Sequence, residues 1–246
     1  MALRKIKLTV CYDGSRYHGW ANQPGQETIQ GQLTEAIQIL TGTEVSITGA
    51  SRTDAGVHAK GQTVTMEVDS PIPTENFAKA ITDRLAEDIA VIDAVEVPGS
   101  FDVIGDVKNK LYHYTIYTGK VRPVMEISKV WHLPGELDVD MMDRAAKLLV
   151  GKKDFKSFAS AADNRENTVR TIFRCDVTGD GDYIYTEVEG DGFLYNMVRN
   201  IVGTLVEVGI GRMKVEKIEE ILAAKDRTAA GPIAAASGLC LEWIKY

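Results

Sequence analysis

The chain has 246 residues, of which 44% are apolar and 26% are charged, so it can bury a sizeable core as one large or two small domains. No apolar run is long enough to span a bilayer and the first residues lack the apolar block of a signal peptide, so we expect a cytoplasmic protein with no membrane partner. The three cysteines are scattered and lack CxxC spacing, which argues against a disulfide framework and against a metal site.

The net charge of −7 argues against a nucleic-acid partner, because neutralising phosphates requires Lys and Arg. The basic residues are unevenly distributed, however, and several groups of them fall in the second half. Any RNA-binding face should draw on these groups, although a solvated surface charge is the simpler interpretation of each one. They are Lys152, Lys153, Lys156, Arg165, Arg170, Arg174, Arg212, Lys214, Lys225 and Arg227.

The first half of the chain predicts the element order β-α-β-β-α-β. Period-two alternation of apolar residues indicates strands, and apolar residues at helical spacing indicate helices. The expected elements are a strand over 5–12, a helix over 28–40 ending at Gly42, strands over 44–48 and 63–68, a helix with Thr74 as N-cap, and a strand over 89–97.

The second half predicts a similar order with one extra helix. The expected elements are a strand over 110–118, a helix over 139–149 stopped by Gly151, strands over 169–177 and 183–188, helices over 193–208 and 215–224, and a strand over 239–246. This order predicts an α+β fold of two ferredoxin-like units side by side. We expect a mainly antiparallel sheet with helices on one face, a central active-site cleft, and domains spanning 1–104 and 105–246.

Residues 50–62 interrupt the regular patterns and are too long and too charged for a tight hairpin. They hold a cation, a carboxylate, an imidazole and two glycines, and loops on a rigid sheet are where reactive groups tend to lie. Taken alone, Asp54 followed two residues later by Gly56 is ordinary turn chemistry.

The string SRTDAGVH at 51–58 resembles the signature loop of the TruA-type tRNA pseudouridine synthases, G-R-T-D-A-G-V-H, with Ser51 in place of glycine. The resemblance covers nearly the whole chain in family order. It continues in YDGSRYHGW at 12–20, YHY at 112–114, FLYNMVRNIVG at 193–203 and AKDRT at 224–228.

The resemblance implies that Asp54 is the nucleophile of a reaction that turns uridine into pseudouridine without metal or cofactor. A carboxylate can add covalently to carbon and so split one hard substitution into two easier steps. The implied substrate is the tRNA anticodon arm, with uridines 38, 39 and 40 as targets. The family also implies a homodimer.

Arg199 is a candidate on its own residues, because it lies in a predicted helix that is apolar around most of its circumference. A buried guanidinium is costly unless it is paired, so Arg199 needs an anion. The family pattern places it against Asp54, where it would keep the carboxylate ionised. A snorkelling side chain, or pairing with Glu207 or Asp191, is the alternative.

Three further residues are candidates for substrate binding. Tyr112 matches the active-site tyrosine of the family and could stack on uracil or transfer a proton. Arg52 could hydrogen-bond an extruded base or replace it in the stem, or else contact a phosphate. His58 could bind substrate or only hold the loop backbone. Tyr114 would point to the same face as Tyr112, and we expect it to pack in the core.

Two places depart from the family pattern. Residues 101–105 read FDVIG where many relatives have a basic run, and Leu111 stands where relatives often carry arginine. Both departures leave Asp54, Tyr112 and Arg199 in place, and they bear on the affinity for tRNA.

Two other functions are open to the same sequence. A non-catalytic RNA-binding module would stack bases on its aromatic side chains. A hydrolase of N-glycosidic bonds would also use a carboxylate, but that class usually needs a second carboxylate beside the first.

Overall fold

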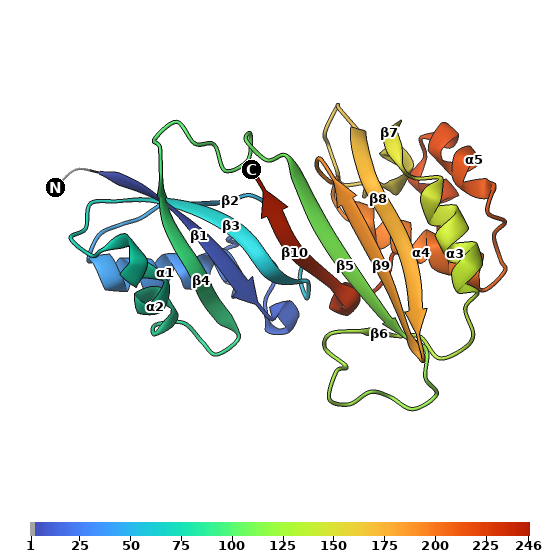
Figure 1. The fold of residues 1–246 in the computed structure, drawn as a ribbon, viewed down its shortest axis with the longest axis horizontal. Helices are drawn as coiled ribbons and strands as arrows, with labels where there is room; N and C mark the ends of the chain where they lie inside the picture. The colour runs from blue at the N-terminus through green and yellow to red at the C-terminus, as the bar shows by residue number, and fades with distance from the viewer. Residues whose placement is uncertain (1–2) are drawn as a thin grey trace. The chain divides into compact units, whose positions relative to one another are not determined.

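The computed structural model describes residues 3–246 and shows, within that range, an α+β protein with five α-helices and mostly antiparallel strands (Figure 1). The chain divides into two compact units. Unit 1 holds the described residues up to Lys108 together with Leu241–Tyr246, and unit 2 holds Asn109–Cys240. The domain border expected between residues 104 and 105 stays a prediction.

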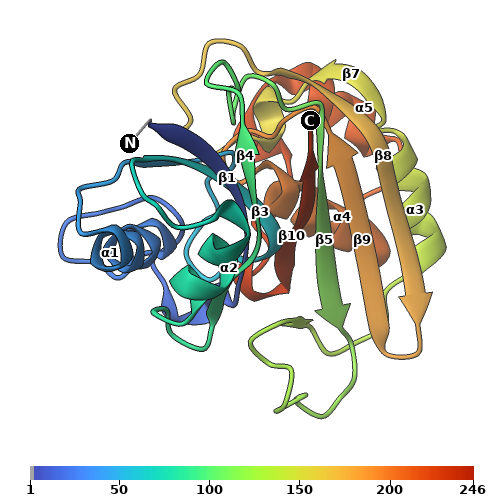
Figure 2. The ribbon, with the colours of Figure 1, turned by 60° about the vertical axis from the view of Figure 1, so that its left-hand side comes forward.

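Unit 1 places two helices on one face of an antiparallel sheet (Figures 1 and 2). The strands run in the order β4-β1-β3-β2, and each is antiparallel to its neighbour. The elements are β1 (Arg4–Tyr12), α1 (Ile29–Thr41), β2 (Ile47–Gly49), β3 (His58–Val68), α2 (Thr74–Thr82) and β4 (Ile89–Val97).

The core of unit 1 lies between this sheet and its helices. Every second residue of β1 from Ile6 to Tyr12 is buried, as the sequence alternation predicts. Leu33 and Ile37 of α1 and Phe77 and Ile81 of α2 are also completely buried. The amphipathic patterns of strand and helices therefore meet at one apolar layer.

α1 begins and ends one residue later than the helix expected over 28–40, and it stops at Gly42 as predicted. Thr28 is the N-cap, and its hydroxyl accepts the amide of Gly31 at 3.2 Å. Gly42 ends the helix in the left-handed conformation, at φ 69°.

The expected N-cap of α2 is wrong by one residue. Pro73 is the N-cap and Thr74 is the first helical residue. The Thr74 hydroxyl accepts a hydrogen bond from Arg4 and donates one to Glu96, so it links α2 to the sheet and caps no amide.

The strand after the Asp54 loop begins earlier than expected. β3 starts at His58 and not near residue 63, because residues 59–62 pair with the end of β1. Tyr12 faces Ala59 and Val10 faces Gln62, with an irregularity in the register between the two pairs. The loop expected over 50–62 is consequently shortened to residues 50–57. The start of the strand was missed because residues 58–62 are polar or small and lack large apolar residues at alternate positions. β2 is also shorter and later than the strand expected over 44–48.

Unit 2 has helices packed against the sheet β5-β9-β8-β7, whose strands are antiparallel to their neighbours (Figures 1 and 2). β6 is a short parallel addition to β5. The elements are β5 (Asn109–Tyr117), β6 (Trp131–His132), α3 (Val139–Lys147), β7 (Gly151–Asp154), β8 (Val169–Asp180), β9 (Tyr183–Gly190), α4 (Met197–Gly209), α5 (Lys217–Ala224) and β10 (Leu239–Lys245), whose last residues belong to unit 1.

Three helix ends of unit 2 differ from the sequence prediction, and one of them is the start of α5, at Lys217 and not at residue 215. α4 begins at Met197 because its N-cap, Asn196, adopts the left-handed conformation at φ 60° and breaks the helical run expected from residue 193. α3 ends at Lys147, and Gly151, at φ 106°, opens the unpredicted strand β7. Within residues 3–246, no helix is long and apolar enough to cross a membrane.

Candidate active site

The aspartate loop, residues 50–57, makes a tight turn at Asp54 in unit 1. The carbonyl oxygen of Asp54 accepts the amide of Val57 at 3.1 Å. Gly56 has φ 78°, which the third residue of a type II turn requires. The turn chemistry read from the sequence is therefore present in the backbone, while the Asp54 side chain is half-buried at the turn.

Residues 13–20, which belong to the second stretch of the resemblance, frame the aspartate loop. The Trp20 amide donates to the carbonyl oxygen of Thr53 at 3.0 Å, and the Gly56 amide donates to the carbonyl oxygen of Tyr17 at 3.4 Å. Two motifs more than thirty residues apart in sequence thus form one structure, and Asp54 lies between the two anchored positions.

Two glycines of this frame allow the backbones to approach. At Gly19, which has φ 88°, a Cβ atom would lie 2.7 Å from the carbonyl oxygen of Thr53 and 3.0 Å from the carbonyl carbon of Asp54. At Gly14 a Cβ atom would overlap the carbonyl oxygen of Val57. Any larger residue at either place would displace the aspartate loop.

The base of the loop is clamped by buried polar side chains. The Gln62 side chain is completely buried; it donates to the carbonyl oxygen of Ser51 at 2.6 Å and accepts the Ser51 amide at 3.2 Å. The hydroxyls of Tyr12 and Thr53 are hydrogen-bonded at 2.7 Å. The two hydrogen bonds from Gln62 use only the backbone of Ser51. They are therefore compatible with serine at position 51, where the family pattern has glycine.

His58 is buried at the first residue of β3 and holds the frame. The amide of Gly14 donates to its Nδ1 at 3.1 Å, which places the proton of a neutral ring on Nε2. The Asp13 carboxylate lies 3.2 Å from the same nitrogen and pairs with it only when the ring is charged. These contacts favour a role in holding the frame of the loop, and substrate binding by His58 stays a prediction.

Arg52 is an exposed residue of the aspartate loop. Its side chain is exposed, unlike those of the neighbouring Thr53 and Val57, which are buried. An exposed guanidinium two residues from Asp54 is free to meet an anion or a base edge.

Tyr112 and Tyr114 share one face of β5 in unit 2. Tyr112 is 6% exposed and meets the ring of Phe193 edge-on, with centroids 5.2 Å apart. Tyr114 is completely buried and its hydroxyl donates to the carbonyl oxygen of Ala235 at 2.6 Å. Burial raises the pKa of the Tyr114 hydroxyl, against the opposing charge of Arg199. The expectation that Tyr114 is a core residue is confirmed.

Arg199 lies on α4 beside this tyrosine strand. Its Nε donates to the carbonyl oxygen of Ala234 at 2.9 Å, adjacent to the carbonyl that receives the Tyr114 hydroxyl. Its Nη1 donates to the Asn196 side chain at 3.2 Å. Unit 2 therefore brings the arginine and the tyrosine strand together, whereas the pairing of Arg199 with Asp54 stays a prediction.

The helix around Arg199 is buried as its sequence predicts. All its residues except Arg199 and Glu207 are buried. The two acids considered as other partners have contacts of their own: Glu207 pairs with Arg212 at 3.4 Å, and Asp191 accepts the amide of Thr171 at 2.9 Å.

Lys110 is a further cation on the face of β5 that carries Tyr112. It lies opposite Gly190, where a Cβ atom would be 3.2 Å from the Phe193 ring. Burial, with a smaller contribution from the charge of Arg165, lowers the pKa of Lys110 to about 8. Sequence reasoning did not single out Lys110, because one lysine at the start of a strand is an ordinary surface residue.

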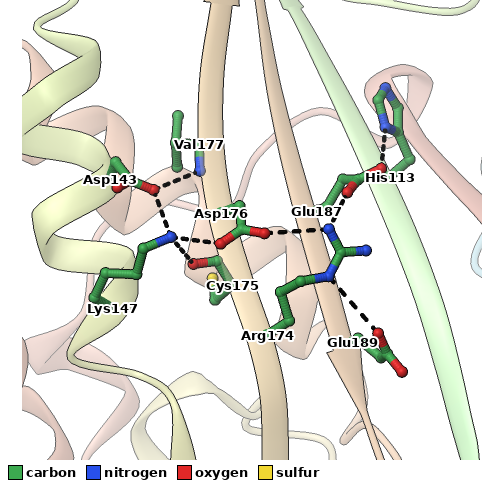
Figure 3. Close-up of polar contacts among 9 residues, drawn as sticks. All are labelled: His113, Asp143, Lys147, Arg174, Cys175, Asp176, Val177, Glu187 and Glu189. Carbon is green, nitrogen blue, oxygen red and sulfur yellow. Dashed lines mark hydrogen bonds and ion pairs between the residues drawn. The ribbon is translucent and has the colours of Figure 1, made fainter.

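Several of the basic residues expected to bind RNA are held by acids within unit 2. Figure 3 shows Arg174 among Asp176, Glu187 and Glu189, with its Nη1 3.1 Å from the Asp176 carboxylate. Lys225 pairs with Asp154 at 2.9 Å. These charges are compensated in the fold and do not form a free phosphate-binding face.

The same network crosses the open face of the sheet in unit 2. Lys147 contacts Asp143 at 2.9 Å and also Asp176, and His113 lies 3.8 Å from Glu187 (Figure 3). The acids outnumber the strong cations on this face, so it repels phosphate. Lys152, Lys156 and Lys214, by contrast, are exposed.

Among residues 3–246, no group of three or more His, Cys, Asp or Glu side chains is placed to hold a metal ion. The candidate residues of both units are instead one carboxylate, two guanidiniums, one lysine, one imidazole and one phenol.

A family model described as tRNA pseudouridine synthase matches residues 8–104 and 145–246, a range that includes the aspartate loop and α4. The chain therefore belongs to the tRNA pseudouridine synthase family.

Full-length relatives agree with this assignment. The chain is 42% identical to "tRNA pseudouridine synthase A" of Caldicellulosiruptor saccharolyticus, over 99% of this chain and 100% of the relative. It is 45% identical to the protein of the same name from Moorella thermoacetica, over 98% of this chain and 99% of the relative. A solved structure, "Structure of H/ACA RNP bound to a substrate RNA containing 2'-deoxyuridine", is matched at TM-score 0.39 and 11% identity, over 82% of this chain and 44% of that chain.

Sequence reasoning missed the residues that hold the candidates in place. Gln62 holds the backbone of the loop, Gly14 and Gly19 leave room for its close approach, and Phe193 packs on Tyr112. All of them except Gln62 lie inside the stretches that carry the resemblance. Their place in these stretches could have marked them as candidates, although the sequence does not reveal what each residue does.

Proposed function

We propose that this chain isomerises uridine to pseudouridine at positions 38, 39 and 40 of the tRNA anticodon arm. The single observation that carries the proposal is the intact aspartate loop, framed by residues 13–20, in a chain that matches named synthases along its full length. The anticodon positions rest on the family resemblance.

Asp54 is the proposed nucleophile. Its carboxylate adds to a carbon of the target uridine and the N-glycosidic bond breaks. The uracil then turns so that C5 joins C1′ of the ribose. The hydrogen on C5 leaves as a proton, N1 takes up a proton, and the carboxylate is released. The atoms balance without oxidant, metal or cofactor.

Arg199 is the proposed ionic partner of Asp54. The bonds from its Nε to Ala234 and from its Nη1 to Asn196 fix the guanidinium at one edge and support a defined orientation for it. A guanidinium is permanently charged and bidentate, so it can hold a carboxylate ionised and aimed.

Tyr112 is proposed to stack on the target base or move a proton, and Phe193 supports its ring from the side. Arg52 is proposed to contact the extruded base or its stem, since it is an exposed cation of the loop. His58 is proposed to contact substrate, although its hydrogen bond with the Gly14 amide already gives it a positioning role.

The proposed partners are the tRNA anticodon arm and a second copy of the chain, in the cytoplasm. Because acids cover the open sheet face around Arg174, we place the tRNA away from that face. The exposed Lys152, Lys156 and Lys214 are the better candidates for phosphate contacts.

The two units are proposed to be ferredoxin-like. Support comes from unit 1, where the order β-α-β-β-α-β folds into the antiparallel strand order β4-β1-β3-β2. The expectation that the units stand side by side around a central cleft stays a prediction.

The reaction is tested by incubating the purified chain with an unmodified tRNA transcript and mapping pseudouridine. Product at positions 38–40 is expected. Free uracil without pseudouridine would instead identify a glycosidic hydrolase, and bound but unchanged tRNA would identify a binding module. Either result overturns the proposal.

A further inference from the structure

Residues 226–235, which follow α5 and its C-cap Lys225, fold back along α4, and we call this segment the strap. It contains most of the AKDRT stretch, which carried part of the resemblance but has no role in the site described so far. The strap begins where the Asp226 amide donates to the Ser157 hydroxyl at 3.0 Å, and it ends where the Ala234 amide donates to the carbonyl oxygen of Arg199 at 3.2 Å.

The first half of the strap is fixed by Arg227. Its Nη2 donates to the side-chain oxygen of Asn200 at 2.8 Å, and the side-chain nitrogen of Asn200 donates in turn to the carbonyl oxygen of Phe158 at 2.8 Å. Asn200 is 1% exposed and directly follows Arg199. Arg227 therefore reaches the helix at the residue next to the proposed catalytic guanidinium.

The second half of the strap lies directly against the helix backbone. The Gly231 amide donates to the Thr204 hydroxyl at 3.0 Å. A Cβ atom at Gly203 would overlap the carbonyl oxygen of Pro232, and one at Gly231 would lie 2.8 Å from the Cα atom of Thr204. This close packing leaves the strap one position along α4.

The end of the strap supplies the acceptor for Arg199. The Ala234 carbonyl oxygen accepts a hydrogen bond from the Arg199 Nε at 2.9 Å, and the Ala234 amide donates one to the carbonyl oxygen of the same arginine. The orientation of the guanidinium is therefore set by the strap as well as by Asn196. A displaced strap would turn the arginine without removing it.

The sequence suggested a different role for Arg227, as a surface cation that meets phosphate. Its acceptors in the structure are the Asn200 side chain and the carbonyl oxygen of Ala230, at 2.8 and 3.4 Å. Burial lowers the pKa of Arg227, as expected for a guanidinium taken partly out of water. A side chain committed to these contacts is poorly available to RNA.

We infer that Arg227 is a positioning residue for catalysis: through Asn200 and the strap, it holds the Arg199 guanidinium in the orientation that the reaction requires. This inference rests on the proposed function, because it names the part of the fold that prepares one of its catalytic groups.

The test compares Arg227→Met with Lys225→Met, a neighbouring cation whose side chain is 63% exposed and pairs with Asp154 on the surface. Arg227→Met should lower kcat about ten- to a hundredfold, since small misplacements of a catalytic group have effects of this size, and leave KM for tRNA within about twofold. Lys225→Met should change neither constant by more than about twofold.

Action through Asn200 is tested by a double-mutant cycle. If Arg227 works through Asn200, Arg227→Met combined with Asn200→Ala should lower kcat no further than the more severe single variant. Multiplicative losses in the double variant would overturn the inference. So would a higher KM with unchanged kcat in Arg227→Met, which would indicate a phosphate contact.

A readout independent of turnover separates this inference from the proposed function. Hydrogen exchange of the Arg199 Nε–H, followed by NMR, should become at least about tenfold faster in Arg227→Met, because the bond to Ala234 is loosened. Unchanged exchange would overturn the inference even if the chain makes pseudouridine. Failure of the wild-type chain to make pseudouridine, with faster exchange in the variant, would overturn the proposed function alone.

Discussion

Lys110 shows how one residue can be unremarkable in a sequence and unusual in a fold. It shares a strand face with Tyr112 and Tyr114, and burial is the main reason that its pKa falls from 10.5 to about 8. At neutral pH the fold therefore carries a half-buried ammonium whose charged form is less favourable there than in water.

The free energy of unfolding should reflect this ammonium. The unfolded chain binds more protons than the folded chain between about pH 8 and 10.5, so the penalty is fully present below pH 8 and is relieved as the pH rises. Lys110→Met should be more stable than the wild type at pH 7, by about 1 to 3 kcal/mol, and its advantage should shrink towards pH 10. Urea unfolding at both pH values measures the difference, and an advantage independent of pH would contradict the assignment.

At the scale of elements, the aspartate loop depends on its frame. The loop is anchored by the backbone of residues 13–20 and by Gln62 of β3, so its shape is determined by residues distant in sequence. A catalytic carboxylate needs such support because small displacements reduce the rate strongly.

Alanine substitutions at two glycines with positive φ distinguish the effect of backbone strain from the effect of a steric contact with the aspartate loop. Gly19 and Gly25 have φ 88° and 72°, but a Cβ atom meets Thr53 at Gly19 and nothing within 4 Å at Gly25. Gly25→Ala should cost about 1 kcal/mol of unfolding free energy and leave kcat unchanged. Gly19→Ala should cost more and also lower kcat, since the alanine displaces the residue next to Asp54.

Urea unfolding and steady-state kinetics on both variants check this prediction. Equal effects of the two substitutions on kcat would show that the frame does not position the loop.

The elements were predictable where a pattern is local. The alternation in β1 and the stop of α1 at Gly42 are short-range signals, and both are confirmed. The start of β3 was not predictable, because residues 58–62 are polar or small and become a strand only by pairing with β1. The start of α4 was missed because one left-handed residue, Asn196, overrides a continuous apolar pattern.

The candidate site divides in the same way. Asp54, Arg52, Tyr112 and Arg199 could be named from motifs, because reactive residue types stand out in a string. Their supports could not, since Gln62, Phe193 and Arg227 act through contacts made only in the folded chain.

At the scale of the whole molecule, an acidic chain must still bind a polyanion. The structure reconciles the two by neutralising some cations internally, such as Arg174, while leaving others exposed, such as Lys152 and Lys156. The net charge of −7 is therefore a poor guide to the RNA-binding face.

The salt dependence of tRNA binding should distinguish these two kinds of cation. Lys152→Gln and Lys156→Gln should each weaken binding and reduce the slope of log affinity against log salt by about one. Arg174→Gln should leave the slope unchanged, because that charge is already met by Asp176 and Glu187. Binding titrations at several salt concentrations provide the slopes, and a reduced slope for Arg174→Gln would contradict this account of the surface.

The measurement that tests the central claim most directly is hydrogen release from C5 of the target uridine, with tRNA labelled with tritium at that position. The wild-type chain should release the label as pseudouridine forms. Asp54→Asn should bind the same tRNA with similar affinity but release label more than about a thousandfold more slowly, since the amide cannot act as nucleophile. Release by Asp54→Asn at a rate within about tenfold of the wild type would contradict the account.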